Sequence, residues 1–239
     1  KSKMPDNLKY RCHQCRKPTP RTDKEQIKQL REWVDKGKAW AQGTMAQWYE
    51  EGEFGLTQSY VMAAMLFEKA VAQGDPNAMN HLANLYDRGR GVDQSFKKAA
   101  ELYTMAAEQG HVKAIFNLGT MYRDGKGVTQ SFKKAIEHFT MAAEQGHVDS
   151  MVNIGIMYIQ GQGVAQSNEI AREWWTKAAK EGQQTAIENL KTLDKQEGKS
   201  TPAPKTALSS PPTAPPVCCS SCNTPQPSGQ TFRKCMGCR

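Results

Sequence analysis

The sequence predicts an all-α protein of stacked helical repeats, because one stretch of 36 residues occurs three times in succession. The copies at 75–110, 111–146 and 147–182 align without a gap. The first two agree at 20 of 36 positions, and at 14 of 17 from Gln94 and Gln130 onward. A fixed period of this length is typical of an array in which each repeat packs only on its neighbours.

Each copy is expected to form two helices joined by a glycine turn. In the first copy, apolar residues recur at helical spacing over 77–87, and again from the N-cap Ser95 to about Gln109. Gly89 and Gly91 lie between them, where glycine adopts positive φ without a Cβ penalty. A small residue recurs once per repeat and predicts a close approach of two helix backbones, at Ala46, Ala83, Gly119 and Gly155.

Flanking elements extend the stack, so the solenoid is expected to cover residues 23–195 in about four repeats. A helix over 23–36 begins at Thr22 or Asp23, and a divergent copy of the repeat starts at Lys38. After Gly182, residues 183–194 repeat the first helix of a pair once more. Its polar outer side chains suit the terminal cap that a solenoid needs for solubility.

Three further segments complete the expected domain organisation. Residues 1–22 form a cysteine-containing N-terminal segment, and residues 218–239 form a small zinc module. Between the repeats and that module, residues 196–217 are rich in proline with no periodicity. This composition predicts a disordered, extended linker that acts as a spacer.

The formal net charge of +8 comes from the two ends of the chain. Residues 1–24 carry eight Lys or Arg against two acids, and residues 191–239 carry seven against two. The remaining 25–190 hold 17 basic and 20 acidic residues, a net charge of −3. A negatively charged repeat region repels a phosphate backbone, so nucleic acid is not expected as the main partner. No run of about 18 apolar residues occurs, so no membrane-spanning helix is expected.

All seven cysteines lie in the tails, which predicts zinc binding in a reducing, intracellular compartment, cytoplasm or nucleus. Structural zinc takes four ligands, and two C-x-x-C pairs in 20 residues are typical of such a site. Cys218 is a fifth thiol of uncertain role beside them. The N-terminal pair alone leaves two alternatives, unliganded thiols or half of a zinc site. The predicted ligands are Cys219, Cys222, Cys235 and Cys238, with Cys12 and Cys15 as the second group.

The repeat resembles the Sel-one-like repeat family (SLR), a relative of the tetratricopeptide repeats. The matching stretches are Leu-Gly-Thr-Met-Tyr at 118–122, Gly-Lys-Gly-Val at 125–128 and Ala-Ala-Glu-Gln-Gly at 142–146. Tetratricopeptide repeats have a period of about 34 residues and lack the glycine turn. The resemblance implies a right-handed α-solenoid that serves as a non-enzymatic, protein-binding scaffold. One departure is serine, where the family usually has an acidic residue before the second helix, at Ser95, Ser131 and Ser167.

The two cysteine-containing ends resemble parts of larger zinc folds. Residues 219–239 are similar to the first half of a MYND-type finger, which implies half-sites for two zincs. Alternatively, the four thiolates close on one zinc, as in a zinc ribbon. Residues 12–18 resemble the last ligand pair of a RING finger. A second hypothesis is therefore a fragment of a RING-type ubiquitin ligase whose repeats recruit substrate.

A protein segment is expected to bind in a groove lined by the first helix of each pair, because these helices vary between copies at positions expected to point outward. One predicted row is Asn80, Phe116, Val152 and Glu188, and the next is Asn84, Thr120, Ile156 and Thr192. A third row places Asn117, Asn153 and Asn189 beside His81. These asparagines either bond the partner's backbone or pair with a neighbouring helix.

No catalytic residue is predicted in the repeats. His111 and His147 recur beside a closing glycine and are expected to be turn residues, while His81 and His138 have no acid or nucleophile at a telling spacing. Methionines recur in register as two pairs, which predicts that they fill the core. The pairs are Met105 with Met141 and Met121 with Met157.

Overall fold

The computed structural model describes residues 22–198, and this range consists of helices joined by turns and short connections, with no strand. Its helices are short, and none has the length and apolarity that crossing a bilayer requires. In chain order they are α1 (Asp23–Asp35), α2 (Ala39–Glu51), α3 (Tyr60–Val71), α4 (Pro76–Arg88), α5 (Phe96–Glu108), α6 (Val112–Asp124), α7 (Phe132–Glu144), α8 (Val148–Gln160), α9 (Asn168–Lys180) and α10 (Gln184–Gln196).

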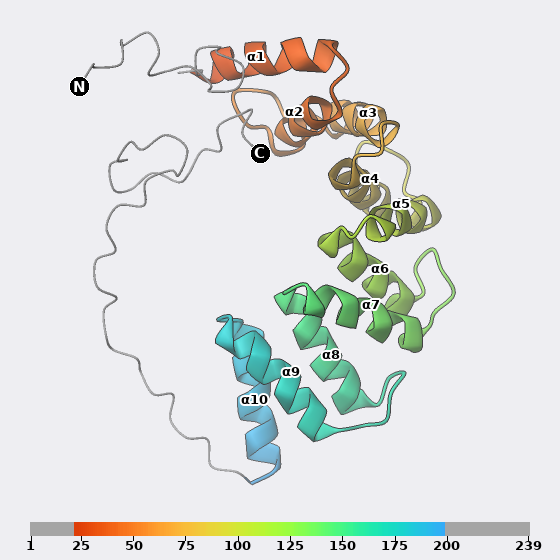
Figure 1. The fold of residues 1–239 in the computed structure, drawn as a ribbon, viewed down its shortest axis with the longest axis vertical. Coiled ribbons are helices and arrows are strands. Elements are labelled where there is room, and N and C mark those ends of the chain that lie inside the picture. The colour runs from red at the N-terminus through yellow and green to blue at the C-terminus, as the bar shows by residue number, and fades with distance from the viewer. Residues whose placement is uncertain (1–21, 199–239) are drawn as a thin grey trace, which may run out of the picture. The chain divides into compact units, whose positions relative to one another are not determined.

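The described helices form four pairs, α2 with α3 through α8 with α9, flanked by α1 and α10. We call α2, α4, α6, α8 and α10 the A helices, and α3, α5, α7 and α9 the B helices. Each helix packs most closely on its neighbours in the chain, and Figure 1 shows the helices succeeding one another in chain order. The predicted all-α solenoid of about four repeats is confirmed. Apart from Thr22 and 196–198, the predicted N-terminal segment, linker and zinc module lie outside the described residues.

Serine side chains fix the start of every B helix. Each serine hydroxyl accepts a hydrogen bond at 3.3 Å from the backbone N–H three residues later. This bond satisfies one of the N–H groups that a helix leaves unpaired at its first turn. Serine therefore replaces the acidic residue without loss of the cap, as predicted. The capping residues are Ser59, Ser95, Ser131 and Ser167.

In the turns after α4, α6 and α8, the second glycine lies against the first residue of the preceding B helix. A Cβ at Gly91 would lie 2.3 Å from the carbonyl carbon of Tyr60. A Cβ at Gly127 would lie 2.1 Å from the carbonyl oxygen of Phe96. These distances are too short for any side chain, and both glycines also have positive φ. The sequence predicted the positive φ, and the structure adds that this glycine lets one repeat dock on the previous one.

In α6 and α8, the small residue makes room for an aromatic ring of the paired B helix. A Cβ at Gly155 would lie 2.3 Å from Nε1 of Trp175, and one at Gly119 would lie 2.9 Å from the ring of Phe139. The Trp175 indole also donates a buried hydrogen bond of 3.1 Å to the carbonyl of Val152. The sequence predicted a close approach of two helix backbones at this position. At Gly155 and Gly119, however, the nearest group is an aromatic side chain and not a backbone.

The methionine prediction is confirmed for one pair and wrong for the other. Met121 and Met157 lie in A helices and are 4% and 1% exposed. Met105 and Met141 lie on the outer side of B helices and are 44% and 47% exposed. No further layer of the described chain covers that outer side, so a residue that recurs in register there need not belong to the core.

Arg172 of α9 fastens the last A helix to the stack. Its guanidinium pairs with Asp194 of α10, and it donates a second hydrogen bond of 2.8 Å to Glu197 just after α10. These ion pairs raise the pKa of Arg172, the Asp194 hydrogen bond contributing most. The expected terminal cap is thus held by charge as well as by apolar packing.

Candidate functional site

The A helices present a stripe of side chains that the core does not cover, and we call this stripe the A face. Its members recur at helical spacing, i, i+4 and i+7, in each A helix. All of them are half-buried or exposed, and most are uncharged and polar. They are Trp40, Thr44 and Gln47 in α2, Asn77, His81 and Asn84 in α4, Lys113, Asn117 and Thr120 in α6, Asp149, Asn153 and Ile156 in α8, and Thr185, Asn189 and Thr192 in α10.

The first predicted row does not form part of the A face. Asn80 and Val152 are only 4% and 6% exposed, so the expectation that they point outward is wrong. Phe116 is half-buried, with its ring centroid 4.6 Å from that of His147. Glu188 alone is exposed. This position meets the next A helix or the paired B helix, and only the last A helix leaves it open.

The second predicted row does lie at the surface. Asn84, Thr120 and Ile156 are half-buried, and Thr192 is exposed. Two of these side chains are held by neighbours in the same helix, since the Asn84 amide donates to the carbonyl of Asn80 and the Thr120 hydroxyl donates to that of Phe116. Their role in binding a partner stays a prediction.

The third predicted row joins neighbouring A helices, which favours the pairing alternative for two of its asparagines. The Asn117 amide donates to Oδ1 of Asn80 at 3.2 Å. Asn153 accepts a hydrogen bond of 2.7 Å from Nη1 of Arg123 and donates to the carbonyl of Asp149. Asn189 is half-buried in the last A helix. The row holds the stack together while remaining accessible from the A face.

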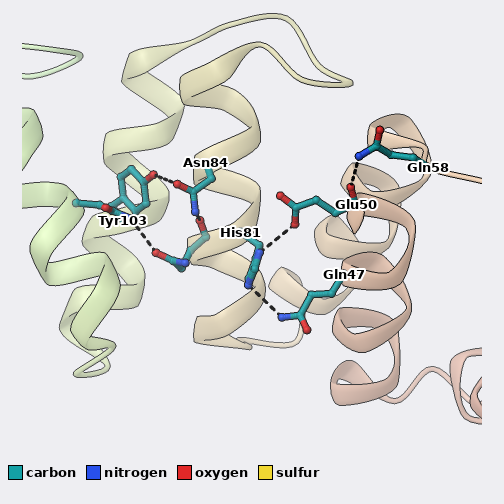
Figure 2. Close-up of polar contacts among 8 residues, drawn as sticks. Gln47, Glu50, Gln58, His81, Asn84 and Tyr103 are labelled. Carbon is teal, nitrogen blue, oxygen red and sulfur yellow. Dashed lines mark hydrogen bonds and ion pairs between the residues drawn. The ribbon is translucent and has the colours of Figure 1, made fainter. Parts of the chain in front are cut away.

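His81 is not isolated, contrary to the sequence-based expectation, because α2 supplies two partners for it. Figure 2 shows Glu50 and Gln47 directed at the two ring nitrogens of His81. Nδ1 lies 3.1 Å from the Glu50 carboxylate, and Nε2 lies 3.0 Å from the Gln47 amide nitrogen. A neutral ring that donates from Nδ1 and accepts at Nε2 satisfies both contacts. The ring of Phe67 stacks on His81 at 5.2 Å.

Figure 2 also shows Asn84 of α4, which forms a hydrogen bond with a residue of the paired helix α5. The hydroxyl of Tyr103 donates to Oδ1 of Asn84 at 2.8 Å. Burial raises the pKa of Tyr103, so the phenol stays protonated and keeps its role as a donor. Asn84 therefore has a fixed orientation before any partner binds.

The Glu50–His81 and Arg123–Asn153 contacts occupy the same two repeat positions with different chemistry. In both, a side chain near the end of one A helix reaches the middle of the next, across 31 and 30 residues. His81 and Asn153 belong to the row predicted from the sequence, whereas Glu50 and Arg123 were not predicted. A comparison of residues about 30 apart in neighbouring copies would have found them.

An open hollow of about 510 Å³ lies on the A face between α6 and α8. Ile156, Met157 and Phe132 supply apolar surface to it, and the Arg123 guanidinium supplies charge. Ile156 is one of only two apolar residues in the A face, and Trp40 is the other. The remaining lining residues are polar, namely Asp124, Gln130, Asn153, Gln160 and Gln162.

Two histidines cap A helices through a ring nitrogen. Nδ1 of His111 accepts from the N–H of Ala114 at 3.2 Å, and Nε2 lies 3.1 Å from Oδ1 of Asn77. Nδ1 of His147 accepts from the N–H of Ser150 at 3.3 Å. Burial, helped by nearby Lys113, lowers the pKa of both histidines. Both rings are thus held in the neutral form that a capping acceptor requires.

The predicted zinc ligands lie outside the described residues, so their geometry stays a prediction. They are Cys12, Cys15, Cys219, Cys222, Cys235 and Cys238. Within 22–198, no three or more His, Cys, Asp or Glu residues are grouped so as to hold a metal ion.

Four consecutive segments of the chain match the family model of the Sel1 repeat, at residues 41–75, 76–111, 112–147 and 148–183. Together they cover more than half of the sequence. The chain belongs to the Sel1 repeat family. The matched segments begin within one residue of the copies seen in the sequence, except for the first, divergent one. No curated protein matches the sequence.

Two solved structures of Sel1-type proteins are similar to this chain. One is c5321, a protective antigen of uropathogenic Escherichia coli strains that displays an SLR fold, at 32% identity and a TM-score of 0.66. The similarity covers 74% of this chain and 38% of that protein. The other is a Sel1 repeat protein from Oxalobacter formigenes, at 26% identity and a TM-score of 0.66, covering 73% of this chain and 68% of that one.

Proposed function

We propose that this chain is a non-enzymatic interaction scaffold whose A face binds a segment of another protein. The observation that carries the proposal is the A face itself, an accessible stripe that continues through all five A helices. Its amide side chains both donate and accept hydrogen bonds, which suits the main chain of an extended segment. The Sel1 repeat fold supports a protein as the partner.

The hollow around Ile156 is the proposed anchor point. An interface draws most of its binding energy from a few buried anchors, and apolar pockets with a polar rim are typical sites for them. Ile156 and Phe132 offer the apolar contact, while Gln160 and Gln162 offer hydrogen bonds at the rim. We expect an apolar side chain of the bound segment to enter here.

The experiment selects peptides that bind the intact chain from a random display library and compares two variants. Ile156→Glu places a charge in the hollow and is expected to weaken the selected peptides about tenfold or more. Met141→Glu is the matched control, because Met141 is exposed on the outer side of α7. Peptides that bind both variants equally well would exclude the hollow as the anchor.

Phe116 and Val152 are unsuitable for this test. Val152 is buried beside Trp175, and Phe116 packs against the core around Phe139. Alanine at either position is expected to lower stability, so reduced binding would have two explanations.

We further propose that the terminal cysteine pairs bind zinc, which would place the protein in a reducing compartment. The spacing of Cys219, Cys222, Cys235 and Cys238 supports this proposal. Zinc content should be measured for the chain with and without residues 218–239, and a stoichiometry of zero in the full chain would contradict it. The ubiquitin-ligase alternative rests on Cys12 and Cys15, which alone do not form a RING.

A further inference from the structure

The two middle helix pairs share a surface on which positive charge is concentrated. It lies where the turn after an A helix leads into a B helix, at 89–98 and 125–134, and we call it the basic edge. These two segments contain six Lys or Arg residues and one acid, Asp93. All six cations are exposed: Arg90, Lys97, Lys98, Lys126, Lys133 and Lys134.

Contacts between repeats make these two segments one continuous surface. A Cβ at Gly127, in the second turn, would lie within 2.8 Å of the backbone of Phe96 and Lys97. The second turn is therefore seated on the start of α5, and it brings Lys126 to the segment that carries Lys97 and Lys98.

Aromatic rings hold four of the cations in place. Lys98 lies over the ring of Tyr86 at 4.9 Å, and Lys134 lies over that of Tyr122 at 5.1 Å. Lys126 lies over Phe96 at 5.8 Å, and Arg90 over Tyr60 at 5.4 Å. A ring restricts the side chain without neutralising its charge, so less conformational entropy is lost when a ligand binds.

Carboxylates of the described chain do not neutralise this surface. The contacts between carboxylates and basic side chains within 22–198 are the hydrogen bond of His81 with Glu50 and the ion pairs of Arg123 with Asp124 and of Arg172 with Asp194 and Glu197. None of them involves a cation of the basic edge. Residues 25–190 have a net charge of −3, so these two segments are positive within a chain region that is negative as a whole.

The first and last helix pairs do not share the feature. The matching segments, 52–62 and 161–170, contain no Lys or Arg and one acid each, Glu53 and Glu169. Positive charge is therefore not a requirement of the turn. The helix pair also forms where the turn has no Lys or Arg, and the two pairs whose turns carry these residues are neighbours.

We propose that the basic edge binds an acidic segment of a partner protein. Six exposed cations in two adjacent turns and helix starts, four of them held by aromatic rings, match a short cluster of carboxylates. Outside these two segments, residues 25–190 carry 11 basic and 19 acidic residues, which disfavours a longer polyphosphate that extends beyond the edge. The surface belongs to the turns and B-helix starts, so this inference does not depend on the function proposed for the A face.

The test measures binding of a fluorescein-labelled octaglutamate peptide to the full chain by anisotropy at low salt. Replacing Lys97, Lys98, Lys133 and Lys134 by Glu should weaken binding about tenfold or more. The matched control makes the same change at four exposed lysines elsewhere, namely Lys28, Lys69, Lys180 and Lys191. It alters net charge equally and should weaken binding about twofold or less.

Each outcome decides the matter. Equal losses in both variants would assign binding to overall charge or to the basic tails and would overturn the proposal. An octathymidylate that binds the edge more tightly than the peptide would replace the proposed partner by nucleic acid. If the charge-reversed variant fails to show the helical spectrum and melting of the parent chain, the Lys-to-Gln variant at the same four positions gives the answer.

Discussion

Between copies of the repeat, the amino-acid sequence of the A helix varies more than that of the B helix. From Gln94 and Gln130 onward, through the B helix, the first two copies agree at 14 of 17 positions, while most differences fall in the A helix. Several of the variable A residues bond to the next A helix, as Asn80 does with Asn117 and Arg123 with Asn153. Variation in a repeat protein is therefore not a direct map of its binding surface. Part of it lies in residues that bond neighbouring A helices to each other.

The largest expected effect separates a buried A-helix methionine from an exposed B-helix one. Met157→Ala should lower the free energy of unfolding by about 3 kcal/mol, because it leaves a cavity in the core. Met141→Ala should change it by no more than about 0.5 kcal/mol, because that side chain is 47% exposed. Denaturant unfolding measures both, and equal losses would contradict the assignment of inner and outer sides.

The next effect concerns the fit between an A helix and its B helix. Gly155→Ala should cost about 2 kcal/mol, because its Cβ would lie 2.3 Å from the Trp175 ring. Trp175→Phe in the same chain should recover part of the loss, because a smaller ring leaves more room for the added Cβ. Thermal melting of the single and double variants tests the coupling. Independent, additive effects would show that the two residues do not share the space.

A smaller effect is expected where one A helix bonds the next. Arg123→Ala removes the 2.7 Å hydrogen bond to Asn153 and should cost about 1 kcal/mol. Arg88→Ala is the control, because Arg88 is exposed near the end of the preceding A helix. If both variants lose the same stability, the bond between the helices contributes nothing measurable.

The smallest effect is the pH dependence of two histidine caps on A helices, whereas the B helices are capped by serines, which do not titrate. The folded-state pKa of His111 and of His147 is lowered, so between it and the unfolded pKa of about 6.5 the unfolded chain binds more protons. Their contribution to stability is complete above about pH 6.5 and is lost as the pH falls through the lowered values. His111→Asp keeps a cap, as Asp75 does for α4, and should flatten this loss in melting curves between pH 7.5 and 5. An unchanged pH profile would contradict the role of the ring nitrogen.

The sequence predicted part of the A face correctly, and its errors concern residues that a neighbouring helix buries. Asn84, Thr120 and Ile156 were predicted to face outward and do so, but Asn80 and Val152, four positions earlier, are covered. Helical periodicity defines a stripe without defining its edges. Whether a residue at the edge is open depends on the side chain that the neighbouring helix supplies.

The sequence by itself determined the repeat, the two helices in it, and the residues that begin and end them. These features follow from interactions within a few residues, such as the Ser95 hydroxyl with the N–H of Lys98 or positive φ at glycine. Only the tertiary structure decided which residues meet across 30 or more positions. It placed Glu50 on His81, seated Gly127 on the start of α5, and exposed Met141 while burying Met157. The physical reason is that such contacts depend on how one repeat docks on the next, and local hydrogen bonds and hydrophobic spacing do not encode that docking.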